Sequence, residues 1–503
     1  MTNLSSNLVE ARRNHPDSVA LRCDDLTLTY AEFDAAAARV ATFLDQAGVE
    51  SGDRIGVMLP NTPAFAVVFY GILRRGAMAV PANPLLKARE IEYYLANTGA
   101  KALFAPPGEA DQAMAGAAAA GAECWVVDDA GLAKLIAGVA QQGEPVLRAD
   151  TDAAVILHTS GTTGKPKGAV LTHGGLGHNA EVCVRTLTRI GPQDVVMGCL
   201  PLFHVFGLTC GLNSAVLAGA TLTLVARFDP RKALEVIERD GVTVFEGVPT
   251  MYSALLGPAA GASPTSARTL RVCISGGASL PVRVLADFEK AFGCTILEGY
   301  GLSETSPVAS FNHPDKPRKA GSVGTPIEGV EMRLVDLNGA EVPRGEPGEI
   351  QIRGHNIMKG YWNLPEATRS AISEDGWFST GDMGRIDEDG YYYIVDRKKD
   401  LIIRGGYNVY PREIEEVLYE HPAVAEAAVV GIAHDSLGEE IGAAVVLKDG
   451  ATAESNELRD FAKNRVAAYK YPRQVWILDA LPKGPTGKVL RREITIPTTQ
   501  SGE

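Results

Sequence analysis

Short β-branched segments alternate with helix-patterned segments over roughly the first three hundred residues. Val19–Cys23, for example, is followed by a helical pattern over Tyr30–Ala47 that stops at Gly48. Further short apolar runs, each bounded by helical segments and by Gly or Pro, are Val155–His158, Val195–Cys199, Thr221–Val225, Val242–Phe245, Val272–Ile274 and Thr295–Leu297. Strands that alternate with helices indicate parallel sheets covered by helices on both faces. The alternation therefore predicts an α/β fold.

The pattern changes near Val330, where the segments GVEMRLVD, GEIQIRG and GYYYIVD alternate apolar and polar residues between Gly-rich turns. Such a pattern is typical of a small antiparallel sheet or barrel. A run of charged residues follows Asp396, and a second α/β unit comes after it. A chain of 503 residues is also too long for one hydrophobic core. We therefore expect an N-terminal domain over residues 1–396 and a C-terminal domain over residues 397–503.

Composition excludes several classes of protein. The net charge of −13 means that nucleic acid and anionic membranes repel the chain overall, so a polyanion must meet a local cationic site. Seven cysteines without a C-x-x-C pair are typical of reduced thiols. The first residues contain no apolar signal segment, and no apolar run approaches the length of a membrane span. These observations predict a cytoplasmic protein that neither crosses a membrane nor binds nucleic acid.

A run of small hydroxyl residues, glycines and lysines follows the strand-like segment that ends at His158. Its residues are Thr159, Ser160, Gly161, Thr162, Thr163, Gly164, Lys165, Pro166, Lys167 and Gly168. Backbone N–H and hydroxyl groups in such a series can converge on an anion, and the lysines add positive charge. Pro166 disfavours a helical Lys165, so the run is not a Walker A loop. We interpret it as a phosphate-binding loop, with a plain surface turn as the alternative.

Three more clusters lie at the ends of strand-like runs, where α/β sheets bind ligands. They are Ser275–Ala278, Glu298–Thr305 and Ser379–Asp382. Tyr300 offers a face for a flat base, Glu304 a hard oxygen ligand for Mg²⁺, and Asp382 an acceptor for two sugar hydroxyls. Taken singly, a tyrosine is more often a core residue, and the two acids are more often surface or turn residues.

Taken together, these motifs closely resemble those of the acyl-CoA synthetases in the adenylate-forming superfamily, from about Thr29 to Arg492. The resemblance implies a large N-terminal domain of two helix-flanked sheets plus a small distorted β-barrel, and a small mobile α/β C-terminal domain. It assigns the phosphate loop to Thr159–Gly168, an aromatic-His motif with a catalytic histidine to His204, and the catalytic lysine to Lys488. The remaining nucleotide-binding positions that it implies are Gly277, Ala278, Gly299, Tyr300, Gly301, Asp382, Ile394 and Arg397.

The chemistry that the resemblance implies is activation of a carboxylate by ATP, with loss of pyrophosphate, to give an acyl-adenylate. Charge builds on the phosphate oxygens in such a step, and preorganised cations and donors stabilise it. Lys488, Mg²⁺ on Glu304, and the hydroxyls of Ser303 and Thr163 would supply that stabilisation. Ser303 stands where many members have Thr, which keeps the hydroxyl group.

In the second step, the resemblance implies that the thiol of coenzyme A attacks the adenylate after the C-terminal domain rotates. The hinge maps to residues 397–400 with its pivot at Lys399, and Gly405 and Gly406 belong to the pantetheine entrance. Ile403 and Gly405 stand where aryl-CoA ligases often have lysines. The resemblance also admits a homodimer.

Some residues that related enzymes use to recognise their acid substrates are absent from this sequence, and their absence limits the class of acid. Val205 stands where amino-acid-activating relatives usually have Asp, and Gly299 where malonate-activating relatives usually have Arg. The segments around His204 and over Phe245–Tyr252 are mostly apolar, and a second carboxylate would be costly there. We therefore expect a medium- or long-chain fatty acid, with an aryl or cinnamate-like acid as the alternative.

Three other functions compete with this interpretation. The enzyme could load an acyl carrier protein instead of coenzyme A. The chain could also be a nucleotide-binding protein without catalysis, although the presence of Lys488, Glu304 and Asp382 argues against that. A phosphotransferase of the Walker A type is disfavoured by Pro166.

Overall fold

The computed structural model describes residues 3–159, 166–257, 269–336, 338–397, 400–404, 407–434, 437–484 and 487–494, without the side chains of Arg397 and Asn408. Within these residues the strands form four sheets, and the two largest lie in the N-terminal part of the chain. The α/β class expected from the alternating pattern is confirmed. No helix in the described ranges is both long and apolar enough to cross a bilayer.

The first large sheet contains the strands nearest the predicted nucleotide-binding positions Gly277 and Tyr300. Its order is β15 (Thr325–Pro326), β14 (Val308–Phe311), β13 (Thr295–Gly301), β12 (Val272–Ser275), β11 (Val244–Gly247), β9 (Val195–Gly198), β10 (Thr221–Leu224), β1 (Val19–Cys23) and β2 (Leu26–Thr29). The strands from β13 to β1 in this order are parallel, so their carboxyl ends lie along one edge.

The second large sheet carries the predicted phosphate loop. Its order is β18 (Gly360–Tyr361), β8 (Lys167–Thr172), β7 (Ala153–Thr159), β4 (Met78–Pro81), β3 (Arg54–Val57), β5 (Ala102–Ala105) and β6 (Glu123–Val126). The strands from β7 to β6 are parallel, whereas β7 and β8 form an antiparallel pair.

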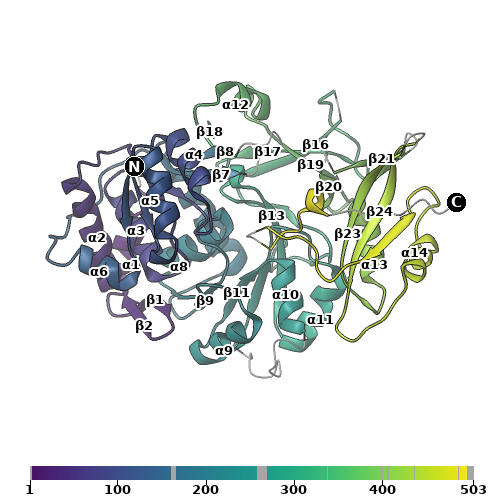
Figure 1. The fold of residues 1–503 in the computed structure, drawn as a ribbon, viewed down its shortest axis with the longest axis horizontal. Coiled ribbons are helices and arrows are strands. Elements are labelled where there is room, and N and C mark those ends of the chain that lie inside the picture. The colour runs from purple at the N-terminus through teal and green to yellow at the C-terminus, as the bar shows by residue number, and fades with distance from the viewer. Residues whose placement is uncertain are drawn as a thin grey trace.

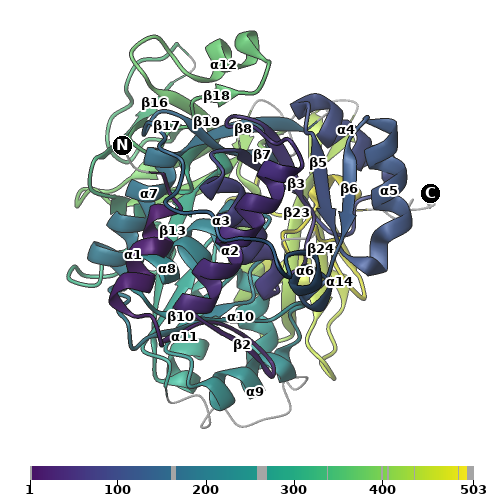
Figure 2. The same cartoon turned by 90° about the vertical axis from the view of Figure 1, so that its left-hand side faces the viewer.

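Helices cover both large sheets and fill the space between them. They are α1 (Ser6–Asn14), α2 (Tyr30–Gln46), α3 (Pro63–Arg74), α4 (Ala88–Thr98), α5 (Ala110–Ala119), α6 (Asp129–Leu135), α7 (His173–Val182), α8 (Ser214–Ala218), α9 (Pro230–Asp240), α10 (Pro249–Leu256) and α11 (Val282–Phe292). Every residue of α3 is buried, as expected for a helix that is apolar all round. Figure 2 shows α2 and α3 crossing the middle of the molecule, with α4 and α5 outside β5 and β6.

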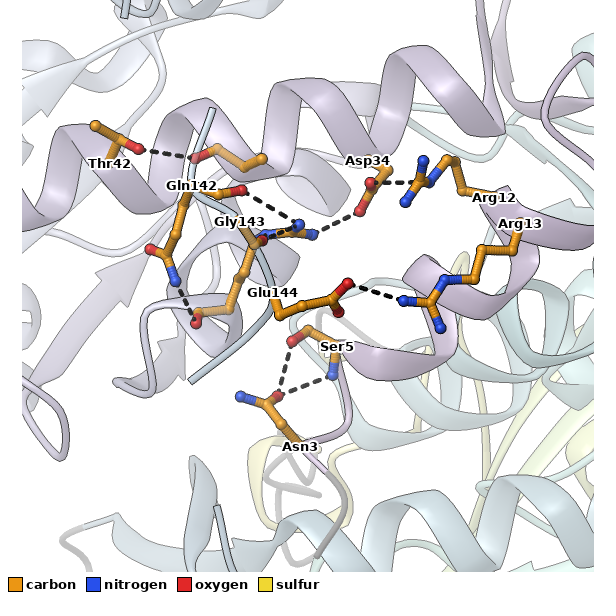
Figure 3. A network of polar contacts seen from close by, with 11 residues as sticks. Asn3, Ser5, Arg12, Arg13, Asp34, Thr42, Gln142, Gly143 and Glu144 are labelled. Carbon is orange, nitrogen blue, oxygen red and sulfur yellow. Dashed lines mark hydrogen bonds and ion pairs between the residues drawn. The ribbon is translucent and has the colours of Figure 1, made fainter. Parts of the chain in front are cut away.

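Ion pairs and hydrogen bonds connect the N-terminal residues and residues 142–144 to α2 and α3 (Figure 3). The buried Arg74 donates to Asp34 at 2.6 Å and to the Gly143 carbonyl at 2.5 Å. On the exposed side, Arg13 pairs with Glu144 at 2.8 Å. The network therefore holds the segment between α6 and β7 in place.

The small antiparallel unit expected after Val330 is present. It is a four-stranded sheet in the order β16 (Val330–Val335), β17 (Gly348–Gly354), β19 (Phe378–Ile386) and β20 (Tyr392–Arg397), with α12 (Pro365–Ala371) beside it.

The C-terminal unit contains its own sheet and hydrophobic core. Its strands are β21 (Ile402–Arg404), β22 (Tyr407–Val409), β23 (Val424–His434), β24 (Gly438–Leu447) and β25 (Gln474–Ile477), and its helices are α13 (Pro411–Tyr419) and α14 (Ser455–Lys463). Ile414, Leu418, Val429 and Leu458 lie in a core separate from the large one. Figure 1 shows this unit at the right, with the C-terminal segment running back toward β13 and α10. The domain boundary at residue 397 stays a prediction.

Candidate active site

The carboxyl ends of β9, β11 and β12 bring three segments of the chain together. The loop after β9 carries His204 and Phe206, β11 leads into Val248, and β12 leads into Gly276 and Gly277. A Cβ atom on Gly276 would lie 3.1 Å from the Phe206 ring, and one on Gly277 would lie 3.4 Å from Val248. Gly277 has φ +79° and is exposed, as is Ala278. These segments form one edge of the candidate site.

The predicted catalytic lysine lies next to the predicted catalytic histidine. Burial and the Lys488 cation lower the pKa of His204 to about 4, so the imidazole is neutral at physiological pH. The His204 Nδ1 atom accepts a hydrogen bond from the Phe206 N–H at 3.3 Å, which orients the ring. The preceding Gly487 packs on the β11–α10 segment, since its Cβ would lie 2.8 Å from Thr250 Oγ1. The C-terminal segment thus brings Lys488 to the edge of the large sheet.

Tyr300 and Asp382, the predicted base platform and ribose acceptor, are in direct contact. Tyr300 Oη donates a hydrogen bond to Asp382 Oδ2 at 2.6 Å, joining β13 to β19. Asp382 is buried, and its N–H donates to Thr380 Oγ1 at 3.0 Å. The carboxylate is therefore held in one orientation, as an acceptor for sugar hydroxyls requires.

Glu304 lies in the short helix η6 (Ser303–Thr305), directly after the predicted Ser303. Tyr361 Oη donates to Glu304 Oε1 at 2.9 Å, and the Lys167 ammonium lies 5.1 Å from the centre of the Tyr361 ring. Burial and the Glu304 carboxylate raise the pKa of Tyr361, so the phenol remains a donor. Tyr361 thus links the predicted metal ligand to a lysine of the predicted phosphate loop.

This arrangement suits Mg²⁺, which in proteins usually binds one or two carboxylates and takes its other oxygens from phosphates and water. The Glu304 carboxylate is fixed by Tyr361 and comes from a residue only 9% exposed. In the described parts of the chain, no group of three or more His, Cys, Asp or Glu side chains could enclose a metal ion. A metal at Glu304 would therefore depend on phosphate oxygens of the nucleotide.

The predicted phosphate loop lies between β7 and β8. Thr159 is the last residue of β7 and pairs with Lys167, the first residue of β8. The run therefore leads into a strand and not a helix, which agrees with its exclusion as a Walker A loop. Ser160, Gly161, Thr162, Thr163 and Gly164 lie outside the described residues.

Two of the predicted glycines are required by packing inside the protein. A Cβ on Gly299 would lie 2.2 Å from the Phe311 ring of β14, and one on Gly301 would lie 1.9 Å from the Pro307 carbonyl oxygen. Both distances are too short for any side chain. The close pairing of β13 with β14 is thus a sufficient reason for these glycines.

The strand β20 connects the candidate site to the C-terminal unit. Arg412 of α13 donates to the Ile394 carbonyl at 2.6 Å, and its N–H donates to Asp396 Oδ2 at 3.1 Å. Arg397 pairs with Asp382 in the β19–β20 register. Lys399, Gly405 and Gly406 lie outside the described residues, as does the Arg397 side chain.

Sequence reasoning missed three residues of this region. Tyr361 follows a glycine in the motif Lys359-Gly360-Tyr361, and this short Lys-Gly-Tyr motif was the available signal. Arg412 stands at the start of α13, and its role depends on contacts with β20 that no local pattern indicates. Glu246 is an acid inside a buried strand, within a sequence segment that is otherwise mostly apolar.

Comparison with known protein families agrees with these features. The family sequence model of the AMP-binding enzymes matches residues 8–362. The family sequence model of the AMP-binding enzyme C-terminal domain matches residues 413–488. Among similar proteins, a long-chain-fatty-acid–CoA ligase of Bacillus subtilis is 36% identical, over 99% of this chain and 95% of its own. A feruloyl-CoA synthase of an Amycolatopsis species is 37% identical, over 97% of each chain.

A solved structure shows the same fold. The ATP-bound MatB from Rhodopseudomonas palustris superimposes with a TM-score of 0.91 at 35% identity, over 97% of each chain. The family models cover most of the chain, and the relatives and the shared fold support the same family. The chain thus belongs to the family of AMP-binding enzymes and is an AMP-forming acid–thiol ligase that uses ATP, Mg²⁺ and coenzyme A.

Proposed function

We propose that this ligase activates a monocarboxylic acid with an uncharged, largely apolar tail, with a medium- or long-chain fatty acid as its preferred substrate. The observation that carries this proposal is the apolar wall behind His204. Val205, Phe206 and Leu208 are buried there. A small inner cavity of about 10 Å³, bordered by the helix η3 (Gly207–Asn213) that follows Phe206, is lined mostly by apolar side chains such as Leu187 and Phe311.

A second acidic group on the substrate would be poorly stabilised in these surroundings. No lysine or arginine is among the residues that line the inner cavity. The space beside Gly299 is filled by the Phe311 ring, so no cation can be placed at that position. A buried carboxylate without a cationic partner is costly, which disfavours dicarboxylates.

An aryl or cinnamate-type acid is the second candidate. The similarity to a feruloyl-CoA synthase favours it, as do the aromatic rings of Phe206, which lies next to Gly276, and of Phe311, which lines the inner cavity. Aromatic rings offer edge and face contacts to an aryl tail, beyond the area that they bury.

The positions of the side chains support the proposed roles. Lys488 would stabilise negative charge on the phosphate oxygens while the substrate carboxylate attacks the α-phosphorus and pyrophosphate leaves. The neutral His204 would orient the carboxylate, and Asp382 would hold the ribose. Attack of the coenzyme A thiol on the carbonyl carbon then releases AMP, after rotation of the C-terminal domain about residues 397–400.

The direct test measures AMP release and product mass with octanoate, palmitate, cinnamate and malonate, each with ATP, Mg²⁺ and coenzyme A. We expect CoA thioesters of octanoate or palmitate, with kcat/KM at least ~10-fold above malonate, because burying the second carboxylate of malonate is unfavourable. Preference for malonate, or thioester formation only on a carrier protein, would contradict the proposal.

A further inference from the structure

Glu246 is a buried carboxyl group without a complete set of partners. It lies on β11, two residues before Val248, and is 1% exposed. Its Oε1 atom is buried and has no hydrogen-bond partner. Burying a polar group without a partner is unfavourable, so such a group calls for an explanation.

A small cavity of about 10 Å³ lies next to this carboxyl group. Besides Glu246, its lining includes Thr188, Cys210, Ser214, Ile274 and Phe311. The Ser214 hydroxyl donates to the Thr209 carbonyl, and the Thr188 hydroxyl donates to the Cys183 carbonyl. The two hydroxyls already have partners, so the Glu246 carboxyl is the polar group in the lining that still lacks one.

Two π-helical segments border the cavity, η2 (Cys183–Thr188) and η3 (Gly207–Asn213). Such helices are rare and occur frequently at functional sites. Within η3, a Cβ on Gly211 would meet Glu246 Oε2 at 3.5 Å and no other atom within 4 Å outside its own helix. The glycine thus lets η3 pass close to the carboxyl group with no side chain between them.

The two elements that border the cavity beside Glu246, η3 and β11, also reach the proposed catalytic pair. The helix η3 begins three residues after His204. The strand β11 continues into Val248, whose side chain would lie 3.2 Å from a Cβ on Gly487, next to Lys488. Both elements therefore run from the His204–Lys488 pair to Gly211 and Glu246.

We infer that Glu246 determines specificity by hydrogen-bonding a neutral oxygen, a hydroxyl or carbonyl, on the otherwise apolar tail of the substrate acid. This inference rests on the proposed function, because it requires the tail to lie between η3 and β11. The oxygen could belong to a phenolic aryl acid or to a hydroxy fatty acid, and both present the same chemistry to the carboxyl group.

The protonation state of Glu246 supports a neutral ligand. Burial raises the pKa of Glu246 to about 8, so at pH 7 the carboxyl group is protonated and can both donate and accept. The ionisable side chains near it include the thiols of Cys199 and Cys210 and the phenol of Tyr252. Burial raises the pKa values of Cys199 and Tyr252, and a hydrogen bond with Cys183, together with burial, raises the pKa of Cys210. Neutral groups on all these sides match a hydroxyl or carbonyl better than a charged substituent.

The test compares acids that differ by one oxygen. For the wild type, kcat/KM is measured with cinnamate and 4-hydroxycinnamate, and with octanoate and 8-hydroxyoctanoate. We expect the hydroxylated member of one pair to be favoured by at least ~10-fold, and the favoured pair identifies the source of the oxygen. Glu246→Leu should remove or reverse this preference, and Glu246→Gln, which keeps the shape and a donor, should retain part of it.

Cys210→Ala serves as the matched control, because it enlarges the same cavity without changing the carboxyl group. It should change kcat/KM for both members of a pair by the same factor. Equal use of both members by the wild type, or an unchanged preference in Glu246→Leu, would overturn the inference and leave the proposed function intact. Turnover of none of the four acids, and of palmitate neither, would contradict the proposed function, and the inference with it.

Discussion

Tyr300 Oη donates a hydrogen bond to Asp382 Oδ2 at 2.6 Å, so that the proposed base platform positions the proposed ribose acceptor. Tyr300→Phe keeps the ring and removes this bond. We expect KM for ATP to rise by ~3- to 10-fold, since one net hydrogen bond is lost, with a smaller effect on kcat. Steady-state kinetics with varied ATP measures both.

Tyr393→Phe is the control for this prediction. Its hydroxyl also donates to an aspartate, Asp387 at 3.2 Å, but on a different part of the β19–β20 hairpin. KM for ATP should not change in that variant. Equal effects of the two substitutions would show that the Tyr300–Asp382 bond has no role in nucleotide binding.

The low pKa of His204 predicts the pH dependence of adenylation. Burial first, and then the Lys488 cation, lower this pKa to about 4, because both disfavour the imidazolium form. His204 is then neutral throughout pH 5.5–8, and kcat/KM for the acid should show no histidine ionisation near pH 6.5. An ionisation in that range that disappears in His204→Asn would contradict this assignment.

The ion pair between Arg74 and Asp34 predicts a large loss of stability when one partner is removed. Both residues are buried, and Asp34→Ala would leave the Arg74 guanidinium without its carboxylate. We expect a destabilisation of about 3–5 kcal/mol, seen as a lower thermal midpoint. Glu144→Ala breaks the neighbouring exposed pair with Arg13 and should have little effect. Similar thermal midpoints for Asp34→Ala and Glu144→Ala would contradict the prediction that the buried ion pair contributes more stability than the exposed one.

The raised pKa of Glu246 also makes stability depend on pH. Between about pH 4.5 and 8, the folded protein keeps a proton on Glu246 that the unfolded chain releases, so stability falls as pH rises. Glu246→Gln removes this penalty. Its thermal midpoint relative to wild type should therefore rise from pH 5 to pH 8, with a free-energy slope of at most about 1.4 kcal/mol per pH unit. A constant difference across this range would show that Glu246 is ionised in the folded state.

Local patterns were sufficient for many elements of the fold. The expected strands Val195–Cys199 and Thr221–Val225 agree with β9 and β10 to within one residue, because β-branched runs bounded by Gly or Pro have few alternatives. The strand expected at Thr295–Leu297 continues to Gly301 in β13. Its second half is glycine-rich and extends only because it pairs with β14, which no local propensity indicates.

The candidate site was predictable as a set of residues but not as a set of contacts. The residue types of Tyr300, Glu304 and Asp382 follow from the motifs, yet the bond between Tyr300 and Asp382 joins residues 82 positions apart. Glu246 could not be recognised because the apolar run around it does not show which face of β11 borders a cavity. The position of Glu246 beside the cavity follows only from the packing of η3 against β11.

Lys488→Ala tests the account most directly, because the account requires this lysine beside His204 during adenylation. The measurement is acid-dependent exchange of pyrophosphate into ATP, with Lys483→Ala, a lysine that pairs with Glu426, as the control. We predict that Lys488→Ala lowers the exchange rate by at least ~10²-fold, about 3 kcal/mol, and that Lys483→Ala leaves it near wild type. Exchange by Lys488→Ala at the wild-type rate would contradict the account.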